Sequence, residues 1–473
     1  MAGFHLSKLP PHSREGALVG PDKTVHALRS RTGTIARAFL CANPFQSAIL
    51  SRGIKRPPTH GRSRNSTPVT MFAQNLLVPG FALLSVAAAQ TATICTQPSV
   101  TINSPADASQ IADCSTIGGS IIIGSDANGI IALDGPSEVK GNLTSLSAGN
   151  LVSITSSTIN KIGGEFRLFN LTLLSNLQFD VLKSVKTIYW EALPTLPQLN
   201  FAGPLSQASS VTISNTFLST LTGINLNTVG TLQIDNNNNL KSFDTQVANI
   251  TNALNINANG NQLAVTFPNL IWAANMTFRN ISSIKFPSLA TVNGSLGFYD
   301  NYMESISAPN LTTIGNFATS FGSMAIVTNE KLTNITFPML KSVGGANQIA
   351  NNTNLNAISF PSLSQVAGAI DFSGNFSTPE LPKLSDVKGG FNVQSKQVIS
   401  CEGFQAQSGG KGSIIQGKFI CKSATATTTT LDGTTTDGST KSSPTPKSDA
   451  ASYHLSEAAL GASIFAGLLQ LIL

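Results

Sequence analysis

The segment Gly230-Thr-Leu-Gln-Ile234 decides the fold, because its pattern recurs along the chain at a nearly constant interval. Gly294-Ser-Leu-Gly-Phe298 and Gly368-Ala-Ile-Asp-Phe372 repeat it: a glycine precedes two large apolar residues separated by one other residue. Alternation with a period of two is typical of a short strand that buries one face. We therefore interpret each such segment as one rung of a repeated structure.

The first apolar position of the segment recurs thirteen times, at steps of 20 to 23 residues and one step of 30. The positions are Ile121, Leu143, Phe166, Ile188, Val211, Leu232, Leu254, Met276, Leu296, Phe317, Asn347, Ile370 and Phe391. Self-similarity at such a period indicates a solenoid, in which stacked rungs pair in a parallel sheet. The predicted fold is mainly β, a parallel β-solenoid of about 13 coils over residues 90–422, between disordered termini.

The long step, between Phe317 and Asn347, predicts an insertion in one coil. The insertion is either a tolerated excursion or a binding loop, since loops that carry function lie on the surface of a rigid scaffold.

Between the two inward positions of each rung lies an outward residue, and this column is polar and nearly uncharged. Its members are Ile122, Thr144, Arg167, Tyr189, Thr212, Gln233, Asn255, Thr277, Gly297, Ala318, Gln348, Asp371 and Asn392. Aligned amides and hydroxyls could hydrogen-bond a polysaccharide, with Tyr189 as a stacking platform and Arg167 beside it. Arg167, Tyr189, Gln233 and Asn255 are the candidate glycan contacts. The alternative is an ordinary solvated sheet face, where Thr, Gln and Asn are common.

Four cysteines lie at the two edges of the repeats: Cys95, Cys114, Cys401 and Cys421. Three pairings are possible. Local pairing within each edge is the economical choice, because each loop of about twenty residues would contribute roughly 3 kcal/mol by restricting the unfolded chain. We expect two disulfides that cap the open ends of the solenoid, rather than free buried thiols.

Ten Asn-x-Ser/Thr sequons lie between the cysteine pairs and predict a heavily N-glycosylated surface in an exported chain. They are Asn142, Asn170, Asn249, Asn275, Asn280, Asn293, Asn310, Asn334, Asn351 and Asn375.

The N-terminal region combines a basic leader with an export signal. Residues 1–70 hold 11 Lys and Arg against 2 Asp and Glu, and we interpret them as a disordered leader or a gene-model extension. Residues 71–89 contain a short apolar stretch that ends in a small-residue cleavage site, which predicts a signal peptide. The alternatives are an organellar leader for residues 1–70 and a membrane-spanning helix for the apolar stretch, which is short for that role.

The C-terminal region indicates a lipid anchor. Residues 423–449 are rich in Thr and Ser, a composition typical of an O-glycosylated stalk. Residues 450–473 end in an apolar tail and follow small residues, the order of a GPI-attachment signal. We expect attachment at Asp449, with Ser448 and Ala450 as alternatives; the competing interpretation of the tail is a membrane-anchoring helix.

Charge and histidine content exclude several functions. The net charge of +6 comes from the leader, since the rest of the chain has 18 basic against 21 acidic residues, so we expect no nucleic-acid partner. No histidine lies between Met71 and Tyr453, which excludes Ser-His-Asp and Cys-His catalysis and histidine-ligated metals there. We predict no catalytic residue, metal or cofactor. An enzyme would have to rely on carboxylates, such as Asp300 with Glu304, or Asp371.

Phe-Pro-x-Leu repeats complete the pattern: they begin at Phe286, Phe337 and Phe360. Together with the cysteine caps, sequons, stalk and anchor signal, they resemble the fungal GPI-anchored cell-wall organisation proteins, whose repeats are similar to receptor L-domains. The likeness covers Cys95 to Leu473. It implies a right-handed, leucine-rich-repeat-like β-solenoid at the outer face of the plasma membrane or in the wall, needed for wall integrity and without established catalytic activity.

We therefore expect a non-catalytic GPI-anchored surface glycoprotein that contributes to cell-wall organisation. Its expected partners are wall polysaccharide or wall proteins, and the membrane through the GPI lipid. The main alternative is a wall-polysaccharide-modifying enzyme that uses Asp and Glu on the solenoid. A sensor receptor is a third hypothesis.

Overall fold

The computed structural model describes residues 93–424. The predicted leader 1–70, the signal peptide 71–89, the GPI signal 450–473 and all but the first two residues of the stalk 423–449 lie outside the described residues. Within residues 93–424, no helix is both long enough and apolar enough to span a bilayer.

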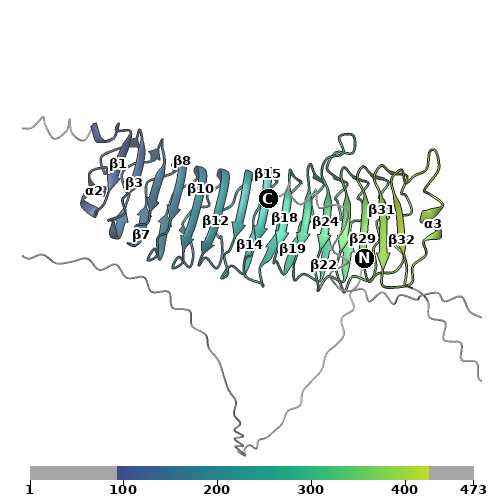
Figure 1. The fold of residues 1–473 in the computed structure, drawn as a ribbon. Helices are drawn as coiled ribbons and strands as arrows, with labels where there is room; N and C mark the ends of the chain where they lie inside the picture. The colour runs from purple at the N-terminus through teal and green to yellow at the C-terminus, as the bar shows by residue number, and fades with distance from the viewer. Residues whose placement is uncertain (1–92, 425–473) are drawn as a thin grey trace, which may run out of the picture. The chain divides into compact units, whose positions relative to one another are not determined.

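The described residues form one stack of β-coils, whose strands lie side by side from β1 to β32 (Figure 1). A 23-stranded parallel sheet follows the whole stack. Its main strands are β1 (Ser99–Ile102), β3 (Ser120–Ile123), β6 (Leu143–Leu146), β8 (Lys161–Phe169), β10 (Ser184–Leu193), β12 (Gln207–Thr216), β13 (Thr228–Asp235), β15 (Asn249–Asn257), β18 (Met276–Arg279), β21 (Leu296–Tyr299), β24 (Met324–Val327), β27 (Asn347–Ala350), β29 (Ile370–Gly374), β31 (Phe391–Ser395) and β32 (Phe419–Lys422).

Short strands also belong to this sheet, and each lies a few residues before the main strand of its coil. They are β2 (Thr116–Ile117), β5 (Glu138–Val139), β17 (Trp272–Ala273), β20 (Thr291–Val292), β23 (Thr313–Ile314), β26 (Ser342–Val343), β28 (Gln365–Val366) and β30 (Asp386–Val387). In β8, β10, β12, β13 and β15 the short and main segments merge into one long strand.

Three smaller parallel sheets succeed one another along a second side of the coils. Their strands are β4 (Asn128–Ala132), β7 (Asn150–Ser156), β9 (Asn176–Phe179) and β11 (Asn200–Phe201); β14 (Ser242–Asp244), β16 (Ala264–Thr266) and β19 (Ser283–Lys285); and β22 (Ser305–Ser307) with β25 (Asn334–Thr336). The coils are thus wound around a continuous interior.

The predicted inward column is confirmed at twelve of its thirteen positions. Leu232 pairs in register with Leu254, Leu254 with Met276, and Met276 with Leu296, and these side chains are buried. One further rung precedes the predicted set, at Val100, and one follows it. Aligned apolar side chains therefore give a continuous core, in which each fully buried side chain contributes about 1.5–3 kcal/mol.

The tenth predicted rung is wrong. The structure pairs Met324, not Phe317, with Leu296 on one side and Asn347 on the other. Met324-Ala-Ile326 has two large apolar residues around a small one, whereas Phe317-Ala-Thr319 lacks the second apolar residue. The usual step of 21 residues from Leu296 favoured Phe317, and this choice placed the insertion after the tenth rung. In the structure the insertion lies before that rung, between Leu296 and Met324.

The inserted segment is a loop between β23 and β24 that projects from the edge of the stack (Figure 1). Gly315 and Gly322 close its base with positive φ angles of 69° and 89°, and Asn316 forms an antiparallel bridge with Phe321. The Nζ atom of Lys388 lies 4.1 Å from the centroid of the Phe317 ring. The loop therefore reaches along the stack to a later coil, where Phe317 contacts Lys388.

The Phe-Pro-x-Leu segments supply another inward stripe, beside the two inward positions of the main strands. Their phenylalanines and leucines are buried, and the Phe337 and Phe360 rings of successive coils stack with centroids 6.0 Å apart. Trp190 is also fully buried in the second inward column.

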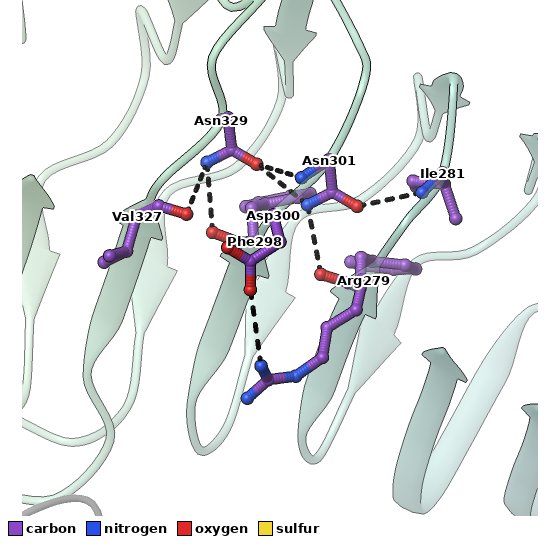
Figure 2. Close-up of polar contacts among 8 residues, drawn as sticks. Arg279, Ile281, Phe298, Asp300, Asn301, Val327 and Asn329 are labelled. Atoms are coloured by element: carbon purple, nitrogen blue, oxygen red, sulfur yellow. Dashed lines mark hydrogen bonds and ion pairs between the residues drawn. The ribbon is translucent and has the colours of Figure 1, made fainter. Parts of the chain in front are cut away.

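In the ten coils from β6 to β27, the chain turns at the end of the main strand through one residue with left-handed backbone. Asn236 has this conformation, with φ of 53°, as asparagine tolerates left-handed backbone better than most residues, so the asparagine run after β13 begins with a turn. The next residue, Asn237, is buried and starts a vertical hydrogen-bonded ladder with Asn259. A second ladder runs through Asn301, Asn329 and Asn352 in later coils (Figure 2 shows its first two members).

Both ends of the stack are closed. The predicted disulfides Cys95–Cys114 and Cys401–Cys421 are formed. Helix α2 (Pro105–Ser109), which begins with a capping box, lies at the first end. Helix α3 (Glu402–Gln405) lies at the other, where the Phe404 ring packs 4.9 Å from that of Phe391. These caps cover terminal coils that would otherwise expose apolar surface and unpaired strand edges.

Candidate functional site

The four predicted glycan contacts lie in one column on the outward face of the 23-stranded sheet. Arg167 of β8 pairs in register with Tyr189 of β10, and Gln233 of β13 pairs with Asn255 of β15. Thr212 of β12 joins the two pairs. All five side chains are half-buried. At about 4.8 Å per strand, the column is about 19 Å long.

One residue of the wider outward column differs from the prediction. Ala325, in β24, takes the place predicted for Ala318, which lies in the inserted loop. The other predicted outward positions stand in register along the sheet.

Arg167 and Tyr189 engage each other. The Arg167 guanidinium carbon lies 4.6 Å from the centroid of the Tyr189 ring, a cation–π contact. The Tyr189 hydroxyl donates a hydrogen bond to Glu191 at 2.5 Å. This bond, with burial and the Glu191 charge, raises the pKa of Tyr189. Arg167 therefore covers one face of the Tyr189 ring, and the stacking of a sugar on this ring stays a prediction.

The amides of the column differ in their bonding. Gln233 Nε2 donates to Asp235 at 2.6 Å, so its carbonyl oxygen is left to accept. The Asn255 amide has no hydrogen bond to the rest of residues 93–424, and its half-buried side chain lies on the outward face with a donor and an acceptor unused. This stretch of the face therefore offers free hydrogen-bonding groups at fixed spacing.

A second arginine–tyrosine pair on the same face escaped the sequence analysis. Arg279 of β18 lies 4.6 Å from the centroid of the Tyr299 ring of β21, and Figure 2 shows its ion pair with Asp300, at 3.7 Å. The Tyr299 ring covers Gly297, where an added Cβ would stand 2.4 Å from the ring. Burial raises the pKa of Tyr299. Both residues follow the second inward position of their rungs, so the repeat spacing could have identified them.

All ten sequon asparagines lie within the described residues, and none is buried. Asn249 and Asn280 are half-buried, and the other eight are exposed. Asn170, Asn280 and Asn351 also occupy the left-handed corner position. Every sequon is thus placed where a glycan can leave the surface.

Two of the carboxylates proposed for an enzyme, Asp300 and Asp371, are engaged by other side chains. Asp300 pairs with Arg279, whereas Asp371 is buried and accepts hydrogen bonds from Gln348 and Asn392. A groove of about 650 Å³ lies at the starts of β8, β10, β12 and β13, and its lining contains no Asp or Glu. Within residues 93–424, no group of three or more His, Cys, Asp or Glu side chains is placed to hold a metal.

These features define a class of protein: a disulfide-capped β-solenoid with many sequons, typical of an oxidising extracellular compartment. The chain is 44% identical over 358 residues to "Protein ecm33" of Aspergillus fumigatus, covering 75% of this chain and 88% of that protein. It is 36% identical to "Cell surface GPI-anchored protein" of Arthroderma benhamiae (79% and 94% covered) and 32% identical to "Cell wall protein ecm33" of Schizosaccharomyces pombe (73% and 80%).

The chain belongs to this Ecm33 family of fungal GPI-anchored cell-wall proteins. It is a glycoprotein of the cell surface and wall, as the sequence predicted. No protein-family model matches the chain, and no solved structure matches it. The relationship to receptor L-domains stays a prediction.

Proposed function

We propose that the protein is a non-catalytic scaffold of the cell wall that contacts wall polysaccharide through the column from Arg167 to Asn255. The observation that carries this proposal is the register of the column: five polar side chains stand on consecutive strands of one rigid sheet. The family membership supports a role in the wall.

A repeating face suits a repeating ligand. Sugar hydroxyls both donate and accept hydrogen bonds, as amides and hydroxyls do. Each such bond contributes about 0.5–1.5 kcal/mol, so several in register are needed for useful affinity. Because the strands fix the side chains in advance, little conformational entropy is lost on binding. The nearly uncharged column favours a neutral polysaccharide over a charged one.

The side-chain partners of Asp300 and Asp371 support a non-catalytic role. Glycosidases generally need two carboxyl groups about 5–10 Å apart on either side of the scissile bond. The Asp300 carboxylate pairs with an arginine, Asp371 is buried among amides, and the groove is lined without acids. The alternative, a carboxylate-dependent polysaccharide-modifying enzyme, therefore has little support in the structure.

The predicted terminal segments would place the scaffold at the cell surface. The signal peptide 71–89 would direct export, and the stalk 423–449 would hold the solenoid away from a GPI lipid at Asp449, or at Ser448 or Ala450. Wall proteins are further candidate partners, through the same face.

Binding to isolated polysaccharides tests the proposal. The purified, enzymatically deglycosylated chain is incubated with insoluble β-glucan, chitin and immobilised mannan, and the bound fraction is measured. We expect saturable binding to at least one of them, without release of new reducing ends. No binding to any of the three would refute the polysaccharide contact, and release of reducing ends would favour the enzyme.

A further inference from the structure

The groove at the starts of the long strands is a feature that the proposed polysaccharide contact does not use. It crosses the first residues of β8, β10, β12 and β13, ahead of their main segments, where the sheet bends. Register irregularities mark this bend between β8 and β10 and between β13 and β15. Its outward residues run in one column: Lys161, Ser184, Gln207 and Thr228. The groove therefore runs across the strands, along the axis of the stack.

The lining has the chemistry of a carbohydrate site. Ser184, Gln207, Ser209 and Thr228 offer hydroxyls and an amide, which donate and accept hydrogen bonds. Lys186 adds a donor and has no ion-pair partner among residues 93–424, whereas Lys161 is held by Glu138 at 2.9 Å. Because no Asp or Glu lines the groove, no lining carboxylate occupies the hydrogen-bond donors of these side chains. The groove has a volume of about 650 Å³ and is open to solvent.

A sequon stands at the open end of this column. Thr228, the last column residue of the groove, pairs in register with Asn249 of β15. The neighbouring Ile250 is buried, so alternation along the strand turns the Asn249 side chain to the groove face. Asn249 is also half-buried, unlike eight of the ten sequon asparagines. A glycan on Asn249 thus begins about one strand spacing, roughly 4.8 Å, from the groove.

We propose that the groove holds the first sugars of the N-glycan carried by Asn249. The covalent link makes this contact intramolecular, so even weak hydrogen bonds hold the glycan at a millimolar or higher effective concentration. A free wall polysaccharide would present the same hydroxyl chemistry but would have to compete with the tethered glycan. The glycan then covers the bend of the sheet beside the polysaccharide-contact column, whose residues are different.

Glycan accessibility on the native protein tests this proposal. The full chain is produced in a glycosylating fungal host, treated with an endoglycosidase without denaturation, and analysed site by site by mass spectrometry. Asn293 is the control, since it is exposed and directly follows β20, whose Thr291 occupies the position of Asn249 two coils further along. We expect release at Asn249 to be at least about fivefold slower than at Asn293, and equal rates after denaturation, because packing must open before cleavage.

A variant separates the groove from other sources of protection. Ser209→Trp fills the groove at an exposed position and should bring the release rate at Asn249 up to that at Asn293. Ser307→Trp, at an exposed position on β22, should leave the protection unchanged. Thr251→Ala, which removes the sequon, should let free mannan oligosaccharide bind in the vacated groove.

Three results would overturn the proposal: an unglycosylated Asn249, equal native release at Asn249 and Asn293, or protection that persists in the Ser209→Trp variant. Each is independent of polysaccharide binding by the column from Arg167 to Asn255. If free oligosaccharide binds the wild-type groove as well as it binds the Thr251→Ala variant, the occupant is a wall polysaccharide and not the Asn249 glycan.

Discussion

Asn301 and Asn329 stand one above the other at the same corner of successive coils, and Asn301 Nδ2 donates to Asn329 Oδ1 at 2.9 Å (Figure 2). The same oxygen accepts the backbone N–H of Asn301, and Asn329 Nδ2 donates to the backbone oxygen of Phe298. Both side chains are buried. The ladder therefore satisfies polar backbone groups at a corner where the sheet cannot reach them.

Replacing Asn329 by alanine should destabilise the stack. The change leaves the Asn301 N–H and the Phe298 carbonyl without partners in the interior, which costs about 2 kcal/mol or more. The measurement is the free energy of urea unfolding. Asn238→Ala, at an exposed position of an asparagine run, is the control and should change the stability by less than about 0.5 kcal/mol. Equal effects of the two changes would show that the ladder does not contribute.

Replacing Asn347 by leucine should stabilise the protein. Asn347 is fully buried in the inward column between Met324 and Ile370, and neither amide atom has a hydrogen-bond partner within residues 93–424. An apolar side chain of similar shape removes the penalty of an unsatisfied amide, about 1–3 kcal/mol. The reverse change, Leu254→Asn, should lower the unfolding midpoint in the same assay. A lower midpoint for Asn347→Leu would contradict this account of the site.

The Tyr189 hydroxyl should titrate above the ordinary tyrosine pKa of 10.0, because its bond to Glu191 favours the neutral form. Glu191→Gln should shift the midpoint back toward that of a free tyrosine. The measurement is the absorbance titration of the phenolate, with the Tyr189→Phe variant subtracted. The stabilisation is complete below pH 10 and is lost as the pH rises through the folded-state pKa. An unchanged midpoint in Glu191→Gln would contradict the assigned cause.

Removing the second disulfide should loosen one end of the stack only. The variant with Cys401→Ser and Cys421→Ser loses a closed loop of about twenty residues, worth roughly 3 kcal/mol. Coils of a solenoid contact only their neighbours, so amide hydrogen exchange should rise in β31 and β32 and stay unchanged in β13 and β15. Faster exchange throughout the stack would show that the cap controls global stability.

The sequence predicted the stack because an apolar column such as Leu232, Leu254 and Met276 records the coil period directly. The prediction is wrong at Phe317, because the constant step points to Phe317 whereas the apolar pattern of the rung lies at Met324. The period also says nothing about contacts between outward neighbours. Alignment placed Arg167 next to Tyr189, but only coordinates show that the guanidinium covers the ring.

The buried asparagines show a further limit. Asn237 and Asn238 are adjacent and chemically identical, yet one is buried in the ladder and the other is exposed. Their roles depend on which residue follows the left-handed corner, and composition cannot settle that. The groove beside Asn249 was also beyond the sequence, because residues from four neighbouring strands line it together.

A comparison of two variants tests the role of the polysaccharide-contact column most directly. One variant replaces Arg167, Thr212, Gln233 and Asn255 by alanine. The control replaces four exposed residues of other sheets by alanine: Ser242, Asp244, Ser305 and Ser307. Binding to the wall polysaccharide that retains the wild-type chain is then measured by sedimentation. We predict at least about tenfold weaker binding for the column variant, since the loss of several hydrogen bonds exceeds 1.4 kcal/mol, and unchanged binding for the control. Equal binding by the two variants would contradict the account.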